Sequence, residues 1–171
     1  MAISIRPAIL NDLGAIRDIY NYYVERSTCT YQIETETESE RRAWFNDRSP
    51  AHPATVAVLE GVVVGWAALS PWKSRCGYSR SVEASVYVHH EKRRHGIGRA
   101  LGLDLIERAK AAEHHTIIGG ADTEQTGSLA LQEALGFVRV AYFREVGHKF
   151  GRWLDVVYMQ LLLERPTSDL R

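Results

Sequence analysis

The sequence predicts a single α/β domain built around one mixed sheet, and three observations support that fold class. The chain has 171 residues, which is the usual size of one domain. Two apolar, β-branched runs in its middle are separated by a two-residue turn, as in an antiparallel hairpin. Strand-like and helix-like segments then alternate from residue 81 onward, before a closing pair of strands. No repeat, linker or low-complexity insert interrupts this order.

The first part of the chain predicts a strand and two helices. Residues 1–6 alternate like a strand, and a helix with apolar residues at helical spacing follows and ends near Arg26. Residues 29–34 are interpreted as a short strand. Thr37 and Glu40 form a capping-box pattern, which predicts the start of a second helix.

The middle of the chain predicts antiparallel strands. The runs 54–59 and 62–69 flank Glu60-Gly61, which is typical of a two-residue hairpin turn. A polar and aromatic loop over 71–80 follows. The alternation of apolar residues over 81–88 then predicts a further strand.

The last part of the chain predicts two helices between strands. In order, the segments are a helix over 96–112, a strand over 115–121, a helix over 128–135, and strands over 137–146 and 153–162 joined by a turn at 147–151. Gly136 ends the second of these helices, since glycine suits a helix C-terminus. We therefore expect the domain to cover residues 1–164, with residues 165–171 as an unpacked C-terminal tail.

The composition argues against several classes of function. Lysine and arginine total 21, and so do aspartate and glutamate, so no net charge draws the protein onto nucleic acid. No segment is apolar over the length that crosses a bilayer, and the first residues lack the pattern of a secretory signal. We expect no nucleic-acid partner, no membrane partner and a cytoplasmic location.

Cysteine and histidine do not occur at metal-binding spacing. Cys29 and Cys76 are far apart and are interpreted as free thiols, while a cysteine nucleophile stays open as an alternative. The histidine pairs at 89–90 and 114–115 are adjacent in sequence, and adjacent residues of an extended chain point to opposite faces. We therefore expect no metal site.

A glycine-rich basic turn follows the strand at 81–88. Its residues are Arg93, Arg94, His95, Gly96, Ile97 and Gly98, with Arg99 directly after them. Unpaired N–H groups and the positive end of a helix dipole meet at such a turn, so it predicts a diphosphate site. The spacing fits neither the nucleoside-triphosphate loop nor the dinucleotide fingerprint. On composition alone, a solvated basic turn is the alternative.

The turn and four other segments together resemble one enzyme family. Those segments read Pro-Trp-Lys-Ser-Arg at 71–75, Val-Glu-Ala-Ser-Val-Tyr-Val at 82–88, Glu-Ala-Leu-Gly-Phe at 133–137 and Lys-Phe-Gly-Arg-Trp-Leu-Asp at 149–155. With Arg-x-x-Gly-x-Gly at the turn, they resemble the phosphinothricin and methionine sulfoximine acetyltransferase branch of the GNAT acyltransferase superfamily over nearly the whole chain. The resemblance implies a GNAT-like domain, in which helices flank a mixed central sheet with a splayed parallel strand pair.

The resemblance also implies acetyl-CoA as co-substrate. It assigns to this cofactor the backbone of Val86, Tyr87 and Val88 for the pantetheine, residues 93–99 for the diphosphate, and Gln125 and Ser128 beside the arm. The sequence departs from the family at two positions, since many members carry Asn in place of Gln125 and Tyr in place of Gln132. That Tyr is the usual candidate to protonate the departing thiolate. Gln132 cannot do so, and the general acid stays unassigned.

Glu83 is the candidate general base, because an amine that is protonated at neutral pH must lose a proton to attack a thioester. It matches the Glu that this branch is thought to use, directly or through a bound water; the alternative is a glutamate that merely faces solvent. An N–H near Val86 or Tyr87 would stabilise the oxyanion. His148 is a second candidate proton acceptor, although herbicide-acetylating relatives carry their His two positions later, at Phe150.

The loop before the Glu83 strand predicts a site for a small amine. The candidate substrate-binding residues are Trp72, Lys73, Arg75, Tyr78, Glu83 and Ser85, which would offer an aromatic wall and cations for a carboxylate or a similar oxyanion. The resemblance favours methionine sulfoximine and methionine sulfone, with phosphinothricin as a further candidate, and a homodimer formed by the closing strands. A protein N-terminal acetyltransferase and an acyl-CoA-binding module without turnover remain alternatives, whereas the balanced charge argues against a nucleic-acid-binding protein.

Overall fold

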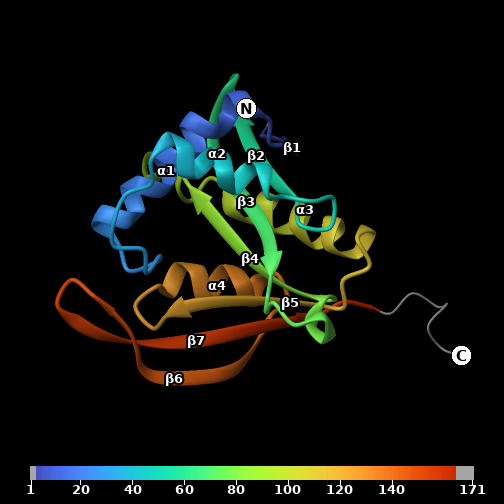
Figure 1. The fold of residues 1–171 in the computed structure, drawn as a ribbon. Helices are drawn as coiled ribbons and strands as arrows, with labels where there is room; N and C mark the ends of the chain where they lie inside the picture. The colour runs from blue at the N-terminus through green and yellow to red at the C-terminus, as the bar shows by residue number, and fades with distance from the viewer. Residues whose placement is uncertain (1–2, 165–171) are drawn as a thin grey trace, which may run out of the picture.

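The computed structural model describes residues 3–164, which fold around one seven-stranded sheet (Figure 1). The strand order is β1-β2-β3-β4-β5-β7-β6, in which β4 and β5 are parallel and every other neighbouring pair is antiparallel. The strands are β1 (Ser4–Pro7), β2 (Ala54–Leu59), β3 (Val62–Pro71), β4 (Ser81–Val88), β5 (Thr116–Asp122), β6 (Val138–Lys149) and β7 (Arg152–Leu162). The helices are α1 (Leu13–Arg26), α2 (Glu38–Asn46), α3 (Ile97–Ala111) and α4 (Thr126–Ala134). The predicted mixed-sheet α/β class is confirmed; the predicted tail at 165–171 lies outside the described residues.

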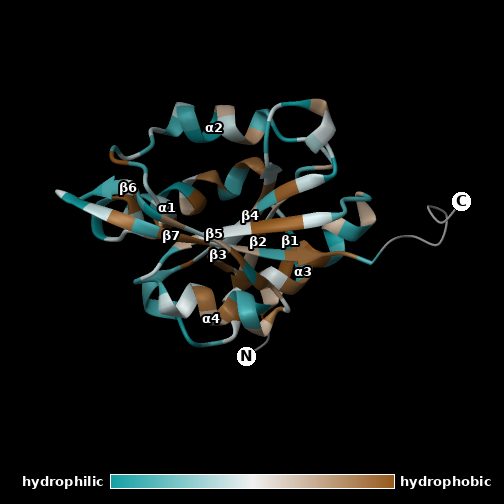
Figure 2. Ribbon diagram, turned by 90° about the horizontal axis from the view of Figure 1, so that it is seen from below, coloured by the Kyte–Doolittle hydropathy of each residue, from teal (hydrophilic) through white to brown (hydrophobic). Residues whose placement is uncertain are grey.

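The helices cover the two faces of the sheet in pairs, with α1 and α2 on one face and α3 and α4 on the other (Figure 2). A fully buried stripe of α3, which includes Leu101 and Leu105, packs on Val82 of β4. On the opposite face, Ile16 of α1 is fully buried in a second apolar cluster with Trp66 of β3. Alternate residues of each strand therefore belong to different layers, and this parity decides which side chains can meet.

Most predicted elements are confirmed within a few residues. The strand at 81–88 is confirmed residue for residue, and Thr37 and Glu40 form the predicted capping box at the start of α2. Glu60 and Gly61 turn between β2 and β3 with positive φ angles of 52° and 79°. Both angles suit the left-handed turn of a two-residue hairpin.

Two predicted elements are wrong. Residues 29–34 form no strand, because long-range contacts hold this linker between α1 and α2: the Lys149 ammonium donates to its backbone, and Asn21 bonds the backbone of Glu36. The closing turn is also shorter than predicted. Phe150 and Gly151 alone form it, both with positive φ, so residues 147–149 belong to β6.

Among residues 3–164, no helix is both long enough and apolar enough to span a membrane.

Candidate functional site

The parallel strands β4 and β5 diverge, and one edge of β4 loses its neighbour. The two strands pair only between residues 81–83 and 116–118 of the described sheet. On its other edge, β4 stays paired with β3 as far as Val88. The second half of β4 therefore offers unpaired backbone on the side facing β5, as expected for a splayed parallel pair.

Backbone groups alternate between the two edges of β4. The N–H of His89 donates to the Val64 carbonyl of β3 at 2.8 Å. Because bonded positions alternate along an antiparallel pair, the N–H and C=O groups of Val86 and Val88 face the free edge, whereas those of Tyr87 face β3. Two of the three predicted backbone contacts thus have the orientation that a ligand at this edge would need, and Tyr87 does not.

The Val88 carbonyl already has a partner. It accepts a hydrogen bond from the Tyr23 hydroxyl of α1, and that hydroxyl in turn accepts one from Nε of Arg93 at 3.0 Å. The Arg93 guanidinium also lies over the Tyr23 ring, 5.0 Å from its centroid. Nδ1 of His95 donates to the Arg93 carbonyl at 2.7 Å and so stabilises the turn between them. Because the Val88 carbonyl is occupied, Val86 is the position in the second half of β4 at which both backbone groups face the free edge without a hydrogen-bond partner among the described residues.

The glycine-rich turn has the conformation of a helix start with an open N-terminus. Gly96 caps α3 with φ +77°, which glycine adopts without strain. A Cβ at Gly98 would lie 3.1 Å from Cδ2 of Leu131, so this glycine lets α3 and α4 pack closely rather than only clearing a path for a ligand. Arg94 and Arg99 are exposed beside the first-turn N–H groups, which have no intrahelical acceptor. The arrangement suits an anion with several oxygens.

The junction between β5 and α4 lies on the far side of the divergence. Nε2 of Gln125 donates to Oγ1 of Thr28 at 2.9 Å and thereby ties the junction to the linker after α1. Gln132 lies one helical turn after Ser128 and contacts its hydroxyl at 3.4 Å. Oε1 of Gln132 is buried against Gly119 and lacks a hydrogen-bond partner within residues 3–164. A hydrogen-bond acceptor without a partner beside the β5–α4 junction suits a ligand that carries N–H or O–H donors.

Glu83 lies half-buried at the point where β4 and β5 diverge. It pairs with Ile118 and shares the α1 face of β4 with Ser85. Burial raises the pKa of Glu83, and the positive charge of Lys73 opposes that rise. Trp72 packs edge-on against Tyr158 of β7 at 5.4 Å, and the Lys73 ammonium lies 5.2 Å from the Trp72 ring. A carboxylate whose pKa is raised by burial is a better proton acceptor than an exposed one, so Glu83 can exchange a proton with a ligand.

The remaining loop candidates lie farther out. Arg75 directly precedes a 3-10 turn (Cys76–Tyr78), and both Arg75 and Tyr78 are exposed, whereas Glu83 is half-buried. His148 lies in β6 rather than in a turn. Its exposed ring contacts Trp153 at 4.7 Å, across the hairpin.

Tyr31, Asp122 and Tyr158 lie close together and were not singled out from the sequence. Burial and the nearby charges of Asp122 and Tyr158 raise the pKa of Tyr31 to about 12, which places these three side chains in one region. Asp122 is 1% exposed. Strand parity is the signal that could have found it, because Ile118, Gly120 and Asp122 share one face and Ile118 pairs with Glu83.

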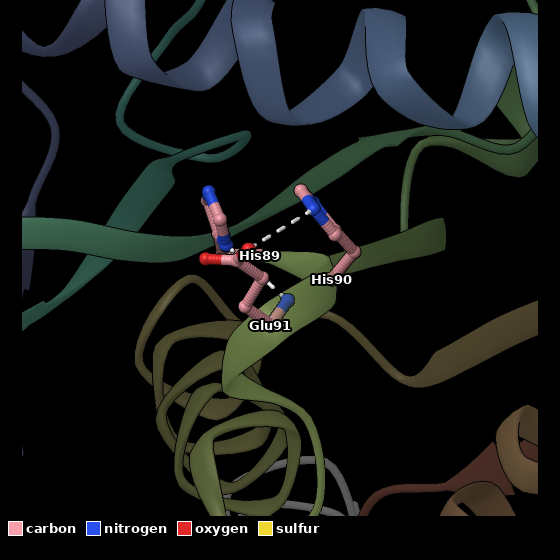
Figure 3. Close-up of side chains that lie close together, drawn as sticks. All are labelled: His89, His90 and Glu91. Carbon is pink, nitrogen blue, oxygen red and sulfur yellow. Dashed lines mark hydrogen bonds and ion pairs between the residues drawn. The ribbon is translucent and has the colours of Figure 1, made fainter.

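The histidine pair at the end of β4 differs from the expectation. His89 and His90 do not point to opposite faces, because a 3-10 turn (His90–Lys92) begins there; their rings stack at 4.5 Å, and Glu91 lies beside them (Figure 3). Their possible metal-ligand atoms lie within 4.8 Å of one another. The rings are tilted by only 22°, so their in-plane lone pairs do not converge on one point, and His90 is also stacked on Tyr22 at 3.8 Å. Coordination of one ion would require this stack to open.

Two cavities have no lining residue from β4 or β5. One, of about 300 Å³, is lined by Pro50, Ala51, Pro53, Arg108, Ala111 and Ala112. Another, of about 220 Å³, lies between α4 and the closing hairpin and includes Thr126, Glu133 and Tyr142. Neither contains a predicted site residue. The candidate site is therefore a seam between diverging strands.

The sequence matches known acetyltransferases over most of its length. Residues 16–137 match the family model described as the acetyltransferase (GNAT) family. The chain is 40% identical over 167 residues to the Escherichia coli K12 protein named L-amino acid N-acyltransferase MnaT, covering 97% of each chain. It is 37% identical to the L-methionine sulfoximine/L-methionine sulfone acetyltransferase of Salmonella typhimurium LT2, covering 97% of this chain and 98% of that protein.

A solved structure shows the same fold with the cofactor bound. The phosphinothricin acetyltransferase of Sinorhizobium meliloti, solved in complex with acetyl-CoA, superimposes with a TM-score of 0.90 at 34% sequence identity. The alignment covers 98% of this chain and 92% of that structure.

Proposed function

The chain belongs to the GNAT acetyltransferase family, and from that premise we propose that it transfers the acetyl group of acetyl-CoA to the α-amino group of a small amino acid analogue. The proposed substrates are methionine sulfoximine and methionine sulfone, with phosphinothricin as a further candidate. Attack is direct, in a complex that holds both substrates, and Glu83 is the general base. The observation that carries the proposal is the unpaired edge of β4, which has Glu83 at its start and the anion-binding turn at its end.

The residues present fit acetyl-CoA. The open N-terminus of α3 and the exposed guanidinium groups of Arg94 and Arg99 suit a diphosphate. The free carbonyl of Val86 suits an amide N–H of the pantetheine arm, which would add to β4 like a further strand. Oε1 of Gln132, which lacks a hydrogen-bond partner among the described residues, offers one more acceptor on the side of α4. Bound acetyl-CoA supplies an activated acyl group, and the protein supplies position and charge.

The amine must be neutral when it attacks. Glu83 accepts its proton, directly or through a water, and its raised pKa makes it a better base than an exposed glutamate. The N–H of Val86 faces the edge where the thioester oxygen gains negative charge, so it can stabilise that charge without rearrangement. The departing thiolate takes a proton from water or from a residue other than Gln132.

The other end of the substrate meets the loop after β3. Trp72 and Tyr158 form an aromatic corner, and the Lys73 ammonium lies over the Trp72 ring, where it can bind a carboxylate. Acetylation removes the positive charge of the amine, so transfer to a toxic amino acid analogue would inactivate it. Such a detoxifying role belongs to the proposal.

A thiol-release assay tests the proposal. Acetyl-CoA is mixed with methionine sulfoximine, methionine sulfone, phosphinothricin, ordinary amino acids and a peptide with a free N-terminal alanine. Release with the amino acid analogues, and none with the peptide, is the expected result. Release with the peptide alone would favour a protein N-terminal acetyltransferase. Acetyl-CoA binding with no release in any mixture would instead favour a binding module.

A homodimer is part of the proposal. β6 is an edge strand, and its exposed apolar side chains with those of β7 include Val138, Val140, Tyr142, Phe143, Val146 and Trp153. Such a surface on a strand edge is typical of an interface. Sedimentation equilibrium should give twice the chain mass, and Val140→Glu should shift it toward the monomer. The free thiols of Cys29 and Cys76 suit the reducing cytoplasm as the proposed location.

A further inference from the structure

Asp122 carries a buried oxygen without a partner. Its side chain lies at the end of β5 and is 1% exposed. One carboxylate oxygen, Oδ1, accepts the backbone N–H of Glu124 at 2.9 Å. The other, Oδ2, makes no hydrogen bond to any residue in the described range 3–164. Buried carboxylate oxygens are seldom left unbonded, so Oδ2 indicates a donor that the protein itself does not supply.

The position of Asp122 relative to Glu83 is set by strand parity. Ile118, Gly120 and Asp122 point to the same face of β5, and Glu83 is paired with Ile118. The two side chains therefore lie on one face, and their positions along the strand direction are about 13 Å apart. Between them, Gly120 leaves the backbone bare and exposed. A Cβ at Gly120 would lie 3.1 Å from Cε1 of Tyr158, so any larger residue would crowd this stretch.

The surrounding charges favour a cation next to Asp122. The charge of Arg152 acts across this region, but its guanidinium is already paired with Glu124 through two nitrogens. Lys73 lies at the opposite end, beside Glu83. An amino acid carries one positive and one negative group, and this arrangement places its carboxylate toward Lys73 and its ammonium toward Asp122. The phosphates of a cofactor would be repelled from the same place.

We propose that Oδ2 of Asp122 accepts a hydrogen bond from the ammonium group of the amino acid substrate and holds that group over Gly120. The inference rests on the proposed function and deepens it by naming the residue that recognises the amine. Asp122 acts in binding, and Glu83 removes the proton, through a water because of the separation between them. The role requires a primary ammonium on the ligand, and it assigns no covalent step to Asp122.

A binding experiment with two matched ligands tests the role. Methionine sulfone and its analogue without the amino group are titrated calorimetrically into the protein saturated with CoA, which prevents turnover. Asp122→Asn keeps the shape and the bond to Glu124 but loses the charge and the acceptor. It should weaken the binding of methionine sulfone by about 10- to 100-fold and leave that of the analogue unchanged.

A carboxylate away from the seam provides the matched control. Asp104→Asn, on α3 and paired with Arg108 at 2.8 Å, should leave every affinity unchanged. An equal loss for both ligands in Asp122→Asn, or a loss of CoA affinity instead, would overturn the inference, because Asp122 would then serve the fold or the cofactor arm. If Asp122→Asn left the affinities for both ligands unchanged and raised the unfolding temperature, the inference would also be overturned. Asp122 would then be only a buried carboxylate that destabilises the fold. If the wild-type protein acetylates no amine in the thiol-release panel, the proposed function itself fails, which is a distinct result.

Discussion

Glu83 shows how the chemistry of a residue is set by its neighbours. Its carboxyl group lies half-buried where β4 leaves β5, and its charge acts on Tyr158, against which Trp72 packs. Burial raises the pKa of this group, and Lys73 keeps the rise from being larger. In a solvated strand position the same glutamate would be a weaker base. The catalytic interpretation therefore depends on the divergence of two strands as much as on the residue itself.

The substitution Glu83→Gln separates activity from stability. The loss of a general base should lower kcat/KM by about 10²- to 10⁴-fold, measured by thiol release. The folded protein raises the pKa of this carboxyl, so the associated stability is fully present below the unfolded-state pKa and is lost as pH rises through the folded-state pKa. Gln cannot ionise, and the variant should unfold at a slightly higher temperature at neutral pH.

The pH dependence gives the control for this variant. Wild-type kcat/KM should fall on the acid side at a pH above the ordinary range of glutamate, and this limb should be absent in Glu83→Gln. Glu107→Gln, an exposed residue on α3 paired with Lys110, should keep the wild-type profile. Full activity of Glu83→Gln across the pH range would rule out Glu83 as the base.

At the scale of elements, the linker between α1 and α2 connects the parts of the site. Thr28 bonds Gln125 at the start of α4, and the carbonyls of Ser27 and Thr30 each accept a hydrogen bond from the Lys149 ammonium at 2.8 Å. These contacts join residues more than ninety positions apart in the chain. Local sequence patterns do not record such contacts, and this is why the strand predicted at 29–34 is wrong.

Lys149→Met tests how strongly the linker is held. The lysine is 2% exposed and its ammonium bonds two carbonyls, so the variant should lose about 1.5–3 kcal/mol of unfolding free energy in urea. Burial lowers the pKa of Lys149, which shows that its charge is partly desolvated. Lys110→Met removes an exposed lysine paired with Glu107 and should change stability by less than about 1 kcal/mol. Equal losses in the two variants would show that Lys149 does not anchor the linker.

At the scale of the whole molecule, periodicity predicted the elements and the resemblance predicted their arrangement. The period-2 pattern of 81–88 and the capping box at Thr37 come from local physics, and both are confirmed. The orientation of Val86 and the alignment of Asp122 with Glu83 depend on register between strands that are distant in sequence. A one-residue shift in register would reverse each of them. The divergence itself has no local signature, and only the resemblance predicted it.

The layer of α1 and α2 is fixed to the sheet by a buried ion pair. The Arg41 guanidinium, 2% exposed, pairs with Glu36 and lies over the rings of Tyr20, Trp44 and Trp66 at 4.5–5.1 Å. Burial is the largest influence on both members, because it raises the pKa of Glu36 and lowers that of Arg41. The two charges therefore compensate each other but are poorly solvated. Removing one of them should lower the free energy of unfolding more than removing both.

Glu36→Gln leaves Arg41 charged among aromatic rings and should reduce the free energy of unfolding by about 3–5 kcal/mol in urea. The double variant Glu36→Gln with Arg41→Met removes both charges and should recover a large part of that loss, since Met can fill the space between the rings. A double-mutant cycle that includes Arg41→Met alone gives the coupling between the two residues. If the double variant were as unstable as the sum of the single variants, the two charges would act independently. Each charge would then stabilise the α1–α2 layer through its own contacts, and not through the ion pair.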